Sequence, residues 1–431
     1  MAKIFLYDEF SPEDVAMMQA LYSRSPESVE KHVEKVRKAG SGNFMEKFYV
    51  GYGHASIADC GSTTVFIEDV SILVDKAVQD SRLYSGQETS TRYIDMSKRR
   101  IVDPIESRAS KDIHRRWMDF YISSQEKVKE ELVKNYPMKD EDNDSSYSRA
   151  IAARTFDILR GFLPAGITTQ LSWHTNLRQA HDKLAILRHH PLEEARQVAQ
   201  EIHRKLQEKY LHSFSHVFDE NQEQYRSLVG QNFSYFLPQK RLAAFSCKST
   251  LSISSLRSYK KLLSSRPPKT LLPMFLGDMG ALSFSFLLDY GSFRDIQRHR
   301  SGICRMPLLT TQIGFHTWYL EQLPRKLRIS AEKLLNLQER HIANLSCDDA
   351  VRQYYIPLGY QVACRMTFDL PGAVYVAELR SGNMVHPTLR VVAHKIGLEL
   401  KKELPSLALY CDFGKDMWDV NRGDQTIQEK K

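Results

Sequence analysis

The sequence predicts an α+β protein that contains two related halves, because the same order of elements occurs twice. In each half an apolar strand leads through a helix to a polar or basic loop, and long helices then lead to a Leu/Pro pair and a further helix. The strands are 63–70 and 282–289, and the pairs are Leu163-Pro164 and Pro357-Leu358. The halves align when Arg82 is placed on Arg300. Phe66 of the first strand then falls on Phe284 of the second. We interpret this order as duplication followed by divergence.

The length of the chain and one polar segment indicate how the halves are divided. A chain of 431 residues favours two domains, and a hydrophobic content of 42% provides for a sizeable core. Residues 246–268 are dense in Ser, Lys and Arg and end in Arg266-Pro267-Pro268, a composition typical of a linker. We therefore predict a first domain at 1–245 and a second at 269–431.

Capping and periodicity signals predict the elements of the first half. Ser11 is placed as an N-cap with Pro12 at the first helical position, and Ser25-Pro26-Glu27 repeats this signal for a second helix. Residues 51–61 are punctuated by glycine and predict a turn, and 139–146 are acidic and predict a solvated loop. The other predicted elements are a strand at Lys3–Tyr7 and helices at 71–82, 105–135, 150–163, 173–187 and 193–216.

The second half shows the same kinds of signal after the polar segment. Apolar residues at 282–289 predict a strand, and the following helix leads to Arg298-His299-Arg300. We expect a long helical region at 331–355, a helix that ends near Arg380 and a last helix at 387–404.

The charge and the cysteines argue against several classes of protein. The formal net charge is +8, but the basic residues are scattered, which favours small anionic ligands over a polynucleotide. The 6 cysteines form no CxxC pair, so we expect reduced thiols and neither a disulfide framework nor a metal site. The N-terminus lacks the apolar core of a signal peptide, and no apolar run approaches the roughly 20 residues of a membrane span. We therefore expect a soluble, cytoplasmic protein.

A polar stretch from Gln87 to Tyr93 is the first candidate site. Its hydroxyl, carboxylate and guanidinium groups suit a loop that wraps an anion, since hydroxyls and Arg donate to phosphate oxygens. On composition alone, a solvated loop after a helix is the better interpretation. A second stretch, Arg298-His299-Arg300, supplies further cations. Taken alone, it is an exposed basic helix end, which the helix dipole favours.

The spacing of several motifs changes this balance, because the first half resembles the flavin-dependent thymidylate synthases over most of residues 1–210. That family has a glycine-His turn, a Phe-rich strand, an RHR, a Ser-x-Arg-Tyr at a fixed spacing, a Leu-Pro and an Asn-x-Arg. The matching residues are Gly53-His54-Ala55-Ser56, Phe66, Ser90-Thr91-Arg92-Tyr93, Arg160 ahead of Pro164, and Asn176-Leu177-Arg178. One motif departs from the pattern, because Asp80-Ser81-Arg82 stands in place of the RHR.

The second half resembles the same family more weakly, over about 282–400. It keeps Arg298-His299-Arg300, but the sequence SGICRMPLLT replaces the serine loop and Asp369-Leu370-Pro371 replaces Asn-x-Arg. Arg380 falls where the family has the arginine that contacts the uracil ring. In the first half Leu187 occupies that place and Arg188 follows it, so Arg188 is the alternative.

The losses in the two halves are complementary. In the family, one subunit of a homotetramer brings the RHR and the ring-contacting arginine, and its partner brings the serine loop and the arginine ahead of Leu-Pro. Here the first half keeps the second set and the second half keeps the first. The resemblance therefore implies two tandem domains that form a pseudo-dimer, with one composite site and an abandoned mirror-related site. We expect a monomer or a homodimer, since one chain already imitates a dimer.

The resemblance also implies the chemistry and the roles of individual residues. The family methylates dUMP to dTMP with methylenetetrahydrofolate as carbon donor, FAD as the redox cofactor and NADPH as reductant. The implied substrate-binding residues are Glu88, Thr89, Ser90, Thr91, Arg92, Arg160 and Arg298. The implied cofactor-binding residues are His54, Ser56, Glu88, Asn176, Arg178, Arg298, His299 and Arg300. Arg380 and Ser90 are the implied catalytic residues.

Blander interpretations stand beside these assignments. His54 and Ser56 also suit a tight turn, Asn176 and Arg178 suit a surface helix, and Glu378 gives Arg380 a possible structural partner. A different class of function is a decayed homologue that binds nucleotide or RNA without turnover, or acts as a partner subunit. The loss of one RHR and one serine loop motivates that alternative.

Overall fold

The computed structural model describes residues 9–23, 25, 27–139, 143–216, 218–238, 243–415 and 418. The strand expected at Lys3–Tyr7 lies outside these residues, and so does Pro26 of the second helix signal. The chain divides into two compact units, and neither is a continuous half of the sequence. The first unit contains residues 1–70, 77–88 and 170–234, and the second contains 71–76, 89–169 and 235–431.

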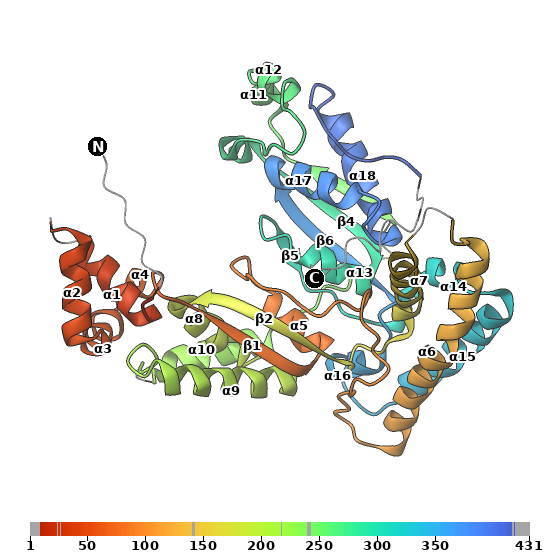
Figure 1. Cartoon of the computed structure of the whole chain (residues 1–431), viewed down its shortest axis with the longest axis horizontal. Helices are drawn as coiled ribbons and strands as arrows, with labels where there is room; N and C mark the ends of the chain where they lie inside the picture. Colours follow the sequence, from red (N-terminus) through yellow and green to blue (C-terminus); the bar gives the residue numbers. More distant parts are fainter. Residues whose placement is uncertain are drawn as a thin grey trace. The chain divides into compact units, whose positions relative to one another are not determined.

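The first unit consists mainly of short helices and one two-stranded sheet (Figure 1). Its helices are α1 (Pro12–Tyr22), α2 (Val29–Ala39), α3 (Gly42–Phe44), η1 (Met45–Gly51), α4 (Ala55–Ala58), α8 (Leu177–Leu187), α9 (Glu193–Lys209) and α10 (Glu220–Gln231). Its strands are β1 (Ser62–Ser71) and β2 (Thr168–Asn176). The last residue of β1 and the first two residues of β2 are counted with the second unit. Helix α5 (Ile72–Gln79) also spans the boundary between the two units.

The start of α1 confirms the capping signal in the sequence. Ser11 is the N-cap, and its hydroxyl accepts a hydrogen bond from the backbone N–H of Asp14 at 3.2 Å, with Pro12 at the first helical turn. Helix α2 starts at Val29 with Ser28 as its N-cap, later than the signal around Pro26 predicts. Within the predicted glycine turn at 51–61, residues Ala55–Ala58 form the short helix α4.

The second unit contains a four-stranded antiparallel sheet in the order β3-β4-β6-β5 (Figure 1). The strands are β3 (Phe245–Ser249), β4 (Ala281–Asp289), β5 (Ile303–Arg305) and β6 (Gln361–Asp369). Strand β4 alternates buried and half-buried residues, as expected for a strand with one face on a core. Helices α17 (Leu370–Ser381) and α18 (Pro387–Glu403) pack against each other and contact β6 and β4. The mixture of helices and small sheets confirms the α+β prediction.

The other helices of the second unit come from both halves of the sequence. From the first half they are α6 (Arg108–Asn135), α7 (Asp144–Leu159) and η2 (Arg160–Phe162). From the second half they are α11 (Ile253–Arg257), α12 (Lys260–Ser264), η3 (Met274–Met279), α13 (Tyr290–Gln297), η4 (Thr311–Ile313), α14 (Thr317–Glu321), α15 (Arg325–Ala343), α16 (Asp349–Arg352) and η5 (Gln353–Tyr355). The second unit therefore brings residues 89–169 together with residues 235–431.

Two strands were predicted as helix, and they occupy equivalent places in the two halves. Residues 173–176 belong to β2, so the helix predicted at 173–187 begins only at Leu177. Likewise, the helix that ends near Arg380 is preceded by β6. Each strand runs into its helix without a loop, so a single segment carries both periodicities. Asn176 is consequently the N-cap of α8, and its side chain accepts from the N–H of Gln179 at 2.8 Å.

The predicted linker carries regular structure. Strand β3 pairs in register with β4 from Phe245↔Phe286 to Ser249↔Leu282, and α11 and α12 follow it. Arg266 at its end is buried and forms an ion pair with Glu378 of α17. The boundaries of two successive domains at 1–245 and 269–431 stay a prediction.

A reciprocal backbone contact joins the two Leu/Pro segments inside the second unit. Pro164 and Pro357 face each other in an antiparallel bridge. The N–H of Ala165 donates to the carbonyl of Ile356 at 3.0 Å, and the N–H of Leu358 donates to the carbonyl of Leu163 at 2.9 Å. In residue number, each donor follows its own proline by one position and each acceptor precedes its own proline by one.

A second pair of hydrogen bonds repeats this reciprocity. The N–H of Gly166 donates to the carbonyl of Tyr354 at 2.9 Å, and the N–H of Gly359 donates to the carbonyl of Gly161 at 2.8 Å. Donors and acceptors again stand at matching positions relative to Pro164 and Pro357. Such an exchange is the pattern of a contact made about a two-fold axis.

The described part of the chain contains no helix that is both long and apolar enough to cross a bilayer.

We expect Gly359→Ala to destabilise the reciprocal contact. A Cβ at Gly359 would lie 2.5 Å from ring carbons of Phe315 and 2.8 Å from the carbonyl oxygen of Gly161. Overpacking of this kind costs about 1–3 kcal/mol, so the midpoint of chemical denaturation should fall accordingly.

Gly382→Ala is the matched control for this experiment. A Cβ at Gly382 meets no atom within 4 Å, and the φ of this residue is −68°. Equal midpoints for the two variants would contradict the tight packing inferred at Gly359.

Candidate functional site

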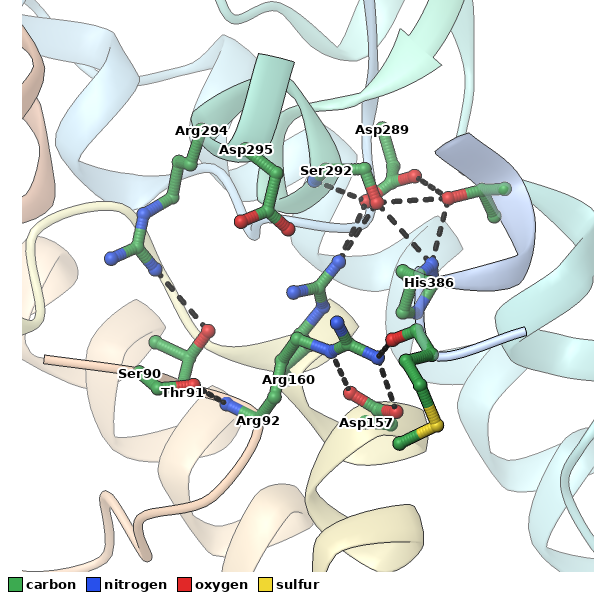
Figure 2. A network of polar contacts seen from close by, with 12 residues as sticks. Ser90, Thr91, Arg92, Asp157, Arg160, Asp289, Ser292, Arg294, Asp295 and His386 are labelled. Atoms are coloured by element: carbon green, nitrogen blue, oxygen red, sulfur yellow. Dashed lines mark hydrogen bonds and ion pairs between the residues drawn. The ribbon is translucent and has the colours of Figure 1, made fainter. Parts of the chain in front are cut away.

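Helix α13 carries the side chains around which the candidate site is built. Asp289, the last residue of β4, caps this helix by accepting from the N–H of Ser292 at 2.8 Å. The helix then places Arg294 and Asp295 on successive positions of its last turn and ends at the RHR motif. Figure 2 shows Asp295 between Arg294 and Arg160. Ser90, Thr91 and Arg92 lie across from α13 in the same view.

Asp295 interacts with arginines from four separate segments of the second unit. Burial raises the pKa of its carboxyl, but the surrounding guanidinium charges outweigh burial and lower this pKa below its ordinary value. In decreasing order of effect these residues, which we call the arginine cluster, are Arg298, Arg92, Arg160 and Arg380. Arg298 is also bonded directly to Asp295, at 2.5 Å. The lowered pKa keeps the Asp295 carboxyl charged at neutral pH, and its side chain is 16% exposed.

Arg294 connects the serine loop to α13. Its guanidinium donates to the Thr91 hydroxyl at 3.2 Å and to the Thr89 carbonyl at 3.3 Å, and it lies 3.9 Å from Asp75 (Figure 2). Arg294 is buried, and so are both threonines. The loop from the first half of the sequence is therefore fixed to a helix from the second half, within one compact unit.

Arg92 is held by a bidentate ion pair. Its Nε donates to Asp157 of α7 at 2.7 Å and its Nη2 donates to the other carboxylate oxygen at 3.2 Å. Burial opposes the charge of Arg92, but Asp157 more than offsets it, so the pKa of the guanidinium is raised. Nη2 also donates to the carbonyl of Met384, just before α18. The backbone N–H of Arg92 donates to the Ser90 hydroxyl at 3.2 Å.

Arg160 lies in a buried network and is 1% exposed. Its Nη2 donates to the Ser292 hydroxyl at 2.8 Å, its Nε donates to the Tyr319 hydroxyl at 3.3 Å, and Asp289 lies 3.7 Å away. Ser292 in turn contacts His386 at 3.2 Å, which extends this network to the start of α18 (Figure 2). A direct contact between Arg160 and a substrate stays a prediction, and its present partners are protein groups.

The three residues of the RHR motif differ in exposure and charge. Arg300 is exposed and the Arg298 side chain is 31% exposed, whereas His299 is buried. Burial, together with Arg380 and Arg298, lowers the pKa of His299 to about 3. His299 is therefore neutral at pH 7, which suits its Nε2 as acceptor of the 2.8 Å hydrogen bond from Nε of Arg380.

Arg380 extends from α17 to the end of α13. Besides its bond to His299, its Nη2 donates to the backbone carbonyl of Asp295 at 2.7 Å. Burial lowers the pKa of its guanidinium, although the group stays protonated at physiological pH. Within the described residues, Nη1 of Arg380 makes no hydrogen bond, so one edge of this guanidinium can donate to a ligand.

Positive charge exceeds negative charge in this region of the second unit. The guanidinium groups belong to Arg92, Arg160, Arg294, Arg298 and Arg380. The carboxylates that pair with them belong to Asp75, Asp157, Asp289 and Asp295. In a partly buried setting such a surplus attracts anions more strongly than it would in water.

Five predicted residues lie in the first unit. Glu88 accepts from the amide of Gln79 at 2.7 Å, while His54 precedes α4 and Ser56 is exposed on it. Asn176 and Arg178 share a partner, because both donate to Asp59, at 3.1 and 2.8 Å. Cofactor binding by these residues stays a prediction.

The remaining predicted residues all lie in the second unit, namely Thr89, Ser90, Thr91, Arg92, Arg160, Arg298, His299, Arg300 and Arg380. Sequence reasoning missed Arg294, Asp295 and Asp157, which hold this set together. Arg294 and Asp295 stand directly ahead of the RHR on the same helix, and this position was the available signal. No sequence signal pointed to Asp157, since its partner Arg92 is remote in sequence.

Comparison with known families identifies the first half. Residues 6–210 match the model of the family described as thymidylate synthase complementing protein. This part of the chain is therefore similar to that family. The match includes the serine loop, Arg160 and the Asn176-Leu177-Arg178 motif, and it confirms the relationship predicted from sequence.

Similar proteins align with both halves of the chain. A UPF0159 protein of Chlamydia pneumoniae is 26% identical over 92% of this chain and 84% of its own length. The UPF0159 protein of Thermoplasma acidophilum is 23% identical over 90% of each chain. A UPF0159 protein of Chlamydia muridarum is 24% identical over 86% of this chain. Each of these alignments therefore extends beyond the residues that match the family model.

We expect His299→Gln to reduce the loss of stability in acid. His299 has a pKa of about 3 in the fold against an ordinary value of 6.5, so between these pH values the unfolded chain binds the proton and the folded chain does not. Stability therefore falls as the pH is lowered through this window, by at most roughly 1.4 kcal/mol per pH unit from this residue. Chemical denaturation at several pH values measures the slope.

His341→Gln on α15 serves as the control, because it leaves His299 and its contact with Arg380 in place. The other buried histidines contribute equally to the pH dependence of stability in the wild type and in both variants. The test is therefore the difference between their slopes of stability against pH. Parallel curves for wild type and His299→Gln would show that His299 is not held neutral by the fold.

Proposed function

We propose that this protein methylates dUMP to dTMP at one composite site, with methylenetetrahydrofolate as carbon donor, FAD as redox cofactor and NADPH as reductant. The observation that carries the proposal is the hydrogen bonding of Arg294 to Thr89 and Thr91. It joins the serine loop kept by the first half to the helix that bears the RHR kept by the second half. The complementary losses in the sequence predict this juxtaposition.

The reciprocal contact around Pro164 and Pro357 supports a pseudo-dimer of two tandem domains. The order of elements supports it as well. Strand β1 leads into α5 and β2 into α8, as β4 leads into α13 and β6 into α17. The N–H groups at the starts of α5 and α13 also have matching acceptors, the carbonyls of Ile167 and Tyr360.

The residues around Asp295 fit an anionic nucleotide and a flavin diphosphate. Arg298 and Arg300 present guanidinium groups to solvent at the end of α13, where planar forks bind phosphate oxygens well. We assign both to the FAD diphosphate, with neutral His299 beside the ring system. When bound, the flavin supplies the hydride of the reaction. For His54, Ser56, Glu88, Asn176 and Arg178 of the first unit, cofactor binding rests on the family resemblance alone.

The serine loop is proposed to bind the phosphate and sugar of dUMP. The Ser90 hydroxyl accepts from the N–H of Arg92 and keeps its own proton for donation to a phosphate oxygen. Thr91 and Arg92 add further donors, although Arg92 is shared with Asp157. Arg160 contributes charge from its buried position, and Arg298 is proposed to contact the dUMP phosphate as well as the FAD diphosphate.

Arg380 is proposed to stabilise negative charge on the uracil ring. Its guanidinium is fixed by His299 and by the carbonyl of Asp295, and Nη1 remains available to a carbonyl oxygen of the base. A donor held in place before the reaction costs no reorganisation when charge develops. In the alternative assignment Arg188 would act, but it is bonded to Glu223 in the first unit.

The purified protein should bind about one FAD per chain. Each complete site needs the serine loop and the RHR together, and the chain carries one of each. A yellow protein whose flavin spectrum bleaches on addition of NADPH, with a titration end point near one, is the expected result.

Two outcomes of the flavin titration would oppose the proposal in different ways. Two flavins per chain would mean that the mirror-related site is functional. A protein that stays colourless with added FAD would favour a decayed homologue that binds nucleotide or RNA, or acts as a partner subunit.

We expect Arg380→Ala to lower turnover roughly 10²–10³-fold, because the proposed contact strengthens in the transition state. Ser90→Ala should instead weaken dUMP binding, by about 1–3 kcal/mol if its partner is left unpaired. Steady-state kinetics and equilibrium dUMP binding separate the two effects.

Arg380→Lys is the sharper variant, because it keeps the charge and loses the planar fork. It should resemble Arg380→Ala in turnover while flavin content stays near that of the wild type. If both variants methylate dUMP and bind it at wild-type levels, Arg380 is structural and the uracil contact lies elsewhere.

A further inference from the structure

The first unit contains a cavity whose walls include one residue of the predicted cofactor set, Arg178, and none of the serine loop or the RHR. Its volume is about 290 Å³, at the lower end of the roughly 300–1,000 Å³ typical of small-molecule pockets. It lies between residues 77–83, helix α8 and the region around α10. Residues of the first unit alone form its walls, so the cavity is complete within one compact unit.

The cavity occupies the place in the first half that the RHR site occupies in the second. Aligning Arg82 with Arg300 puts Asp80 on Arg298 and Ser81 on His299. Both Asp80 and Ser81 line the cavity. Its long wall is α8, which follows β2 as α17, the helix of Arg380, follows β6. The mirror-related position has therefore lost its arginines but kept a space of ligand size.

The polar groups of this cavity include a carboxyl and an amine in close association. Nζ of Lys183 donates to the backbone carbonyl of Asp80 at 2.7 Å. Burial raises the pKa of the Asp80 carboxyl and lowers the pKa of the Lys183 amine, and each group partly offsets the effect on the other. The pair thus supplies an acceptor and a donor at one point of the wall.

Arg178 and His189, which also line the wall, are engaged with nearby carboxylates. Arg178 pairs with Asp59 and Asp182, at 2.8 and 3.3 Å. His189 contacts Glu223 at 3.0 Å. Asp80 and Lys183 are consequently the charged pair that a ligand could meet as hydrogen-bond partners, beside neutral polar groups such as the Gln179 amide.

Aromatic surfaces complete the cavity. Trp173 of β2 is buried in its wall, and Phe233 packs edge-to-face on His190, with ring centroids 5.1 Å apart. Flat apolar walls with an adjacent donor and acceptor match the face and the hydrogen-bonding edge of a nucleobase. A phosphate is disfavoured, because Asp80 places a carboxylate where the equivalent site has a guanidinium.

We propose that this cavity binds a pyrimidine nucleoside without a phosphate, with Asp80 and Lys183 at the edge of the base and Trp173 against its face. The mirror-related position is then a second binding site of changed specificity, which contains neither the serine loop nor the RHR. The choice of a pyrimidine rests on the proposed function. The existence of the site does not, since it follows from the cavity and its lining.

The test is isothermal titration of the full chain with thymidine, and with dTMP for comparison. We expect thymidine to bind at least tenfold more tightly than dTMP to this site. Lys183→Met should weaken thymidine binding at least tenfold, since it removes the donor and keeps an unbranched side chain. Arg380→Ala, in the composite site, should leave thymidine binding unchanged.

A second variant keeps the test decisive if Lys183→Met fails to fold. Ile186 is 55% exposed at the rim of the cavity, so Ile186→Trp can fill the space without touching the buried pair. It should abolish thymidine binding while FAD content stays at the wild-type level. FAD content reports on the composite site, so failure of the proposed function is recognised separately.

Three results would overturn the inference. The first is the absence of thymidine binding to a folded wild-type chain at millimolar concentration. The second is binding that survives Ile186→Trp, which would place the ligand outside the cavity. The third is binding that Arg380→Ala abolishes and the cavity variants leave intact, which would assign thymidine to the composite site.

Discussion

The attraction between Asp295 and the arginine cluster is the interaction on which the candidate site depends. Buried guanidinium groups are costly unless carboxylates and hydrogen bonds compensate them, and repulsion within the cluster would otherwise separate its four segments. Asp295 compensates the guanidinium charges at the centre of the cluster. Asp157 and Asp289 compensate those of Arg92 and Arg160. Because compensation is incomplete, the proposed site retains excess positive charge, which favours an anionic ligand.

The backbone contact between the two Leu/Pro segments explains why these charges can meet. Residues 161–166 and 354–359 hold each other through N–H and carbonyl groups, which leaves their side chains free to differ. Helix α7, with Asp157 and then Arg160, is fixed on one side of this contact. Strand β6 and α17, with Arg380, follow on the other. Backbone hydrogen bonds thus hold these segments together, while the side chains that follow them form the candidate site.

Sequence reasoning reached the elements that carry local signals and missed those that do not. The cap at Ser11, strand β4 and helix α18 were all predicted, because capping residues and periodicity are visible in a short window. Strands β2 and β6 were missed, since each passes directly into a helix without a breaking residue. The set from Thr89 to Arg92 and from Arg298 to Arg380 came from family motifs. The hydrogen bond from Arg294 to Thr91, which connects these two groups of residues, could not be predicted from the sequence. Its partners lie about two hundred positions apart, and only folding brings them together.

The reciprocal contact has a consequence for how such a chain changes over time. When two identical subunits pair, every substitution appears on both sides of the axis, so neither side can specialise. Here both sides are encoded separately, and a substitution alters one of them. Arg160 and Gln353 each stand four positions ahead of their proline, yet Arg160 joins the arginine cluster and Gln353 accepts a hydrogen bond from the backbone of Leu309. The two equivalent positions therefore differ in role, because Arg160 belongs to the arginine cluster and Gln353 supports the backbone at Leu309.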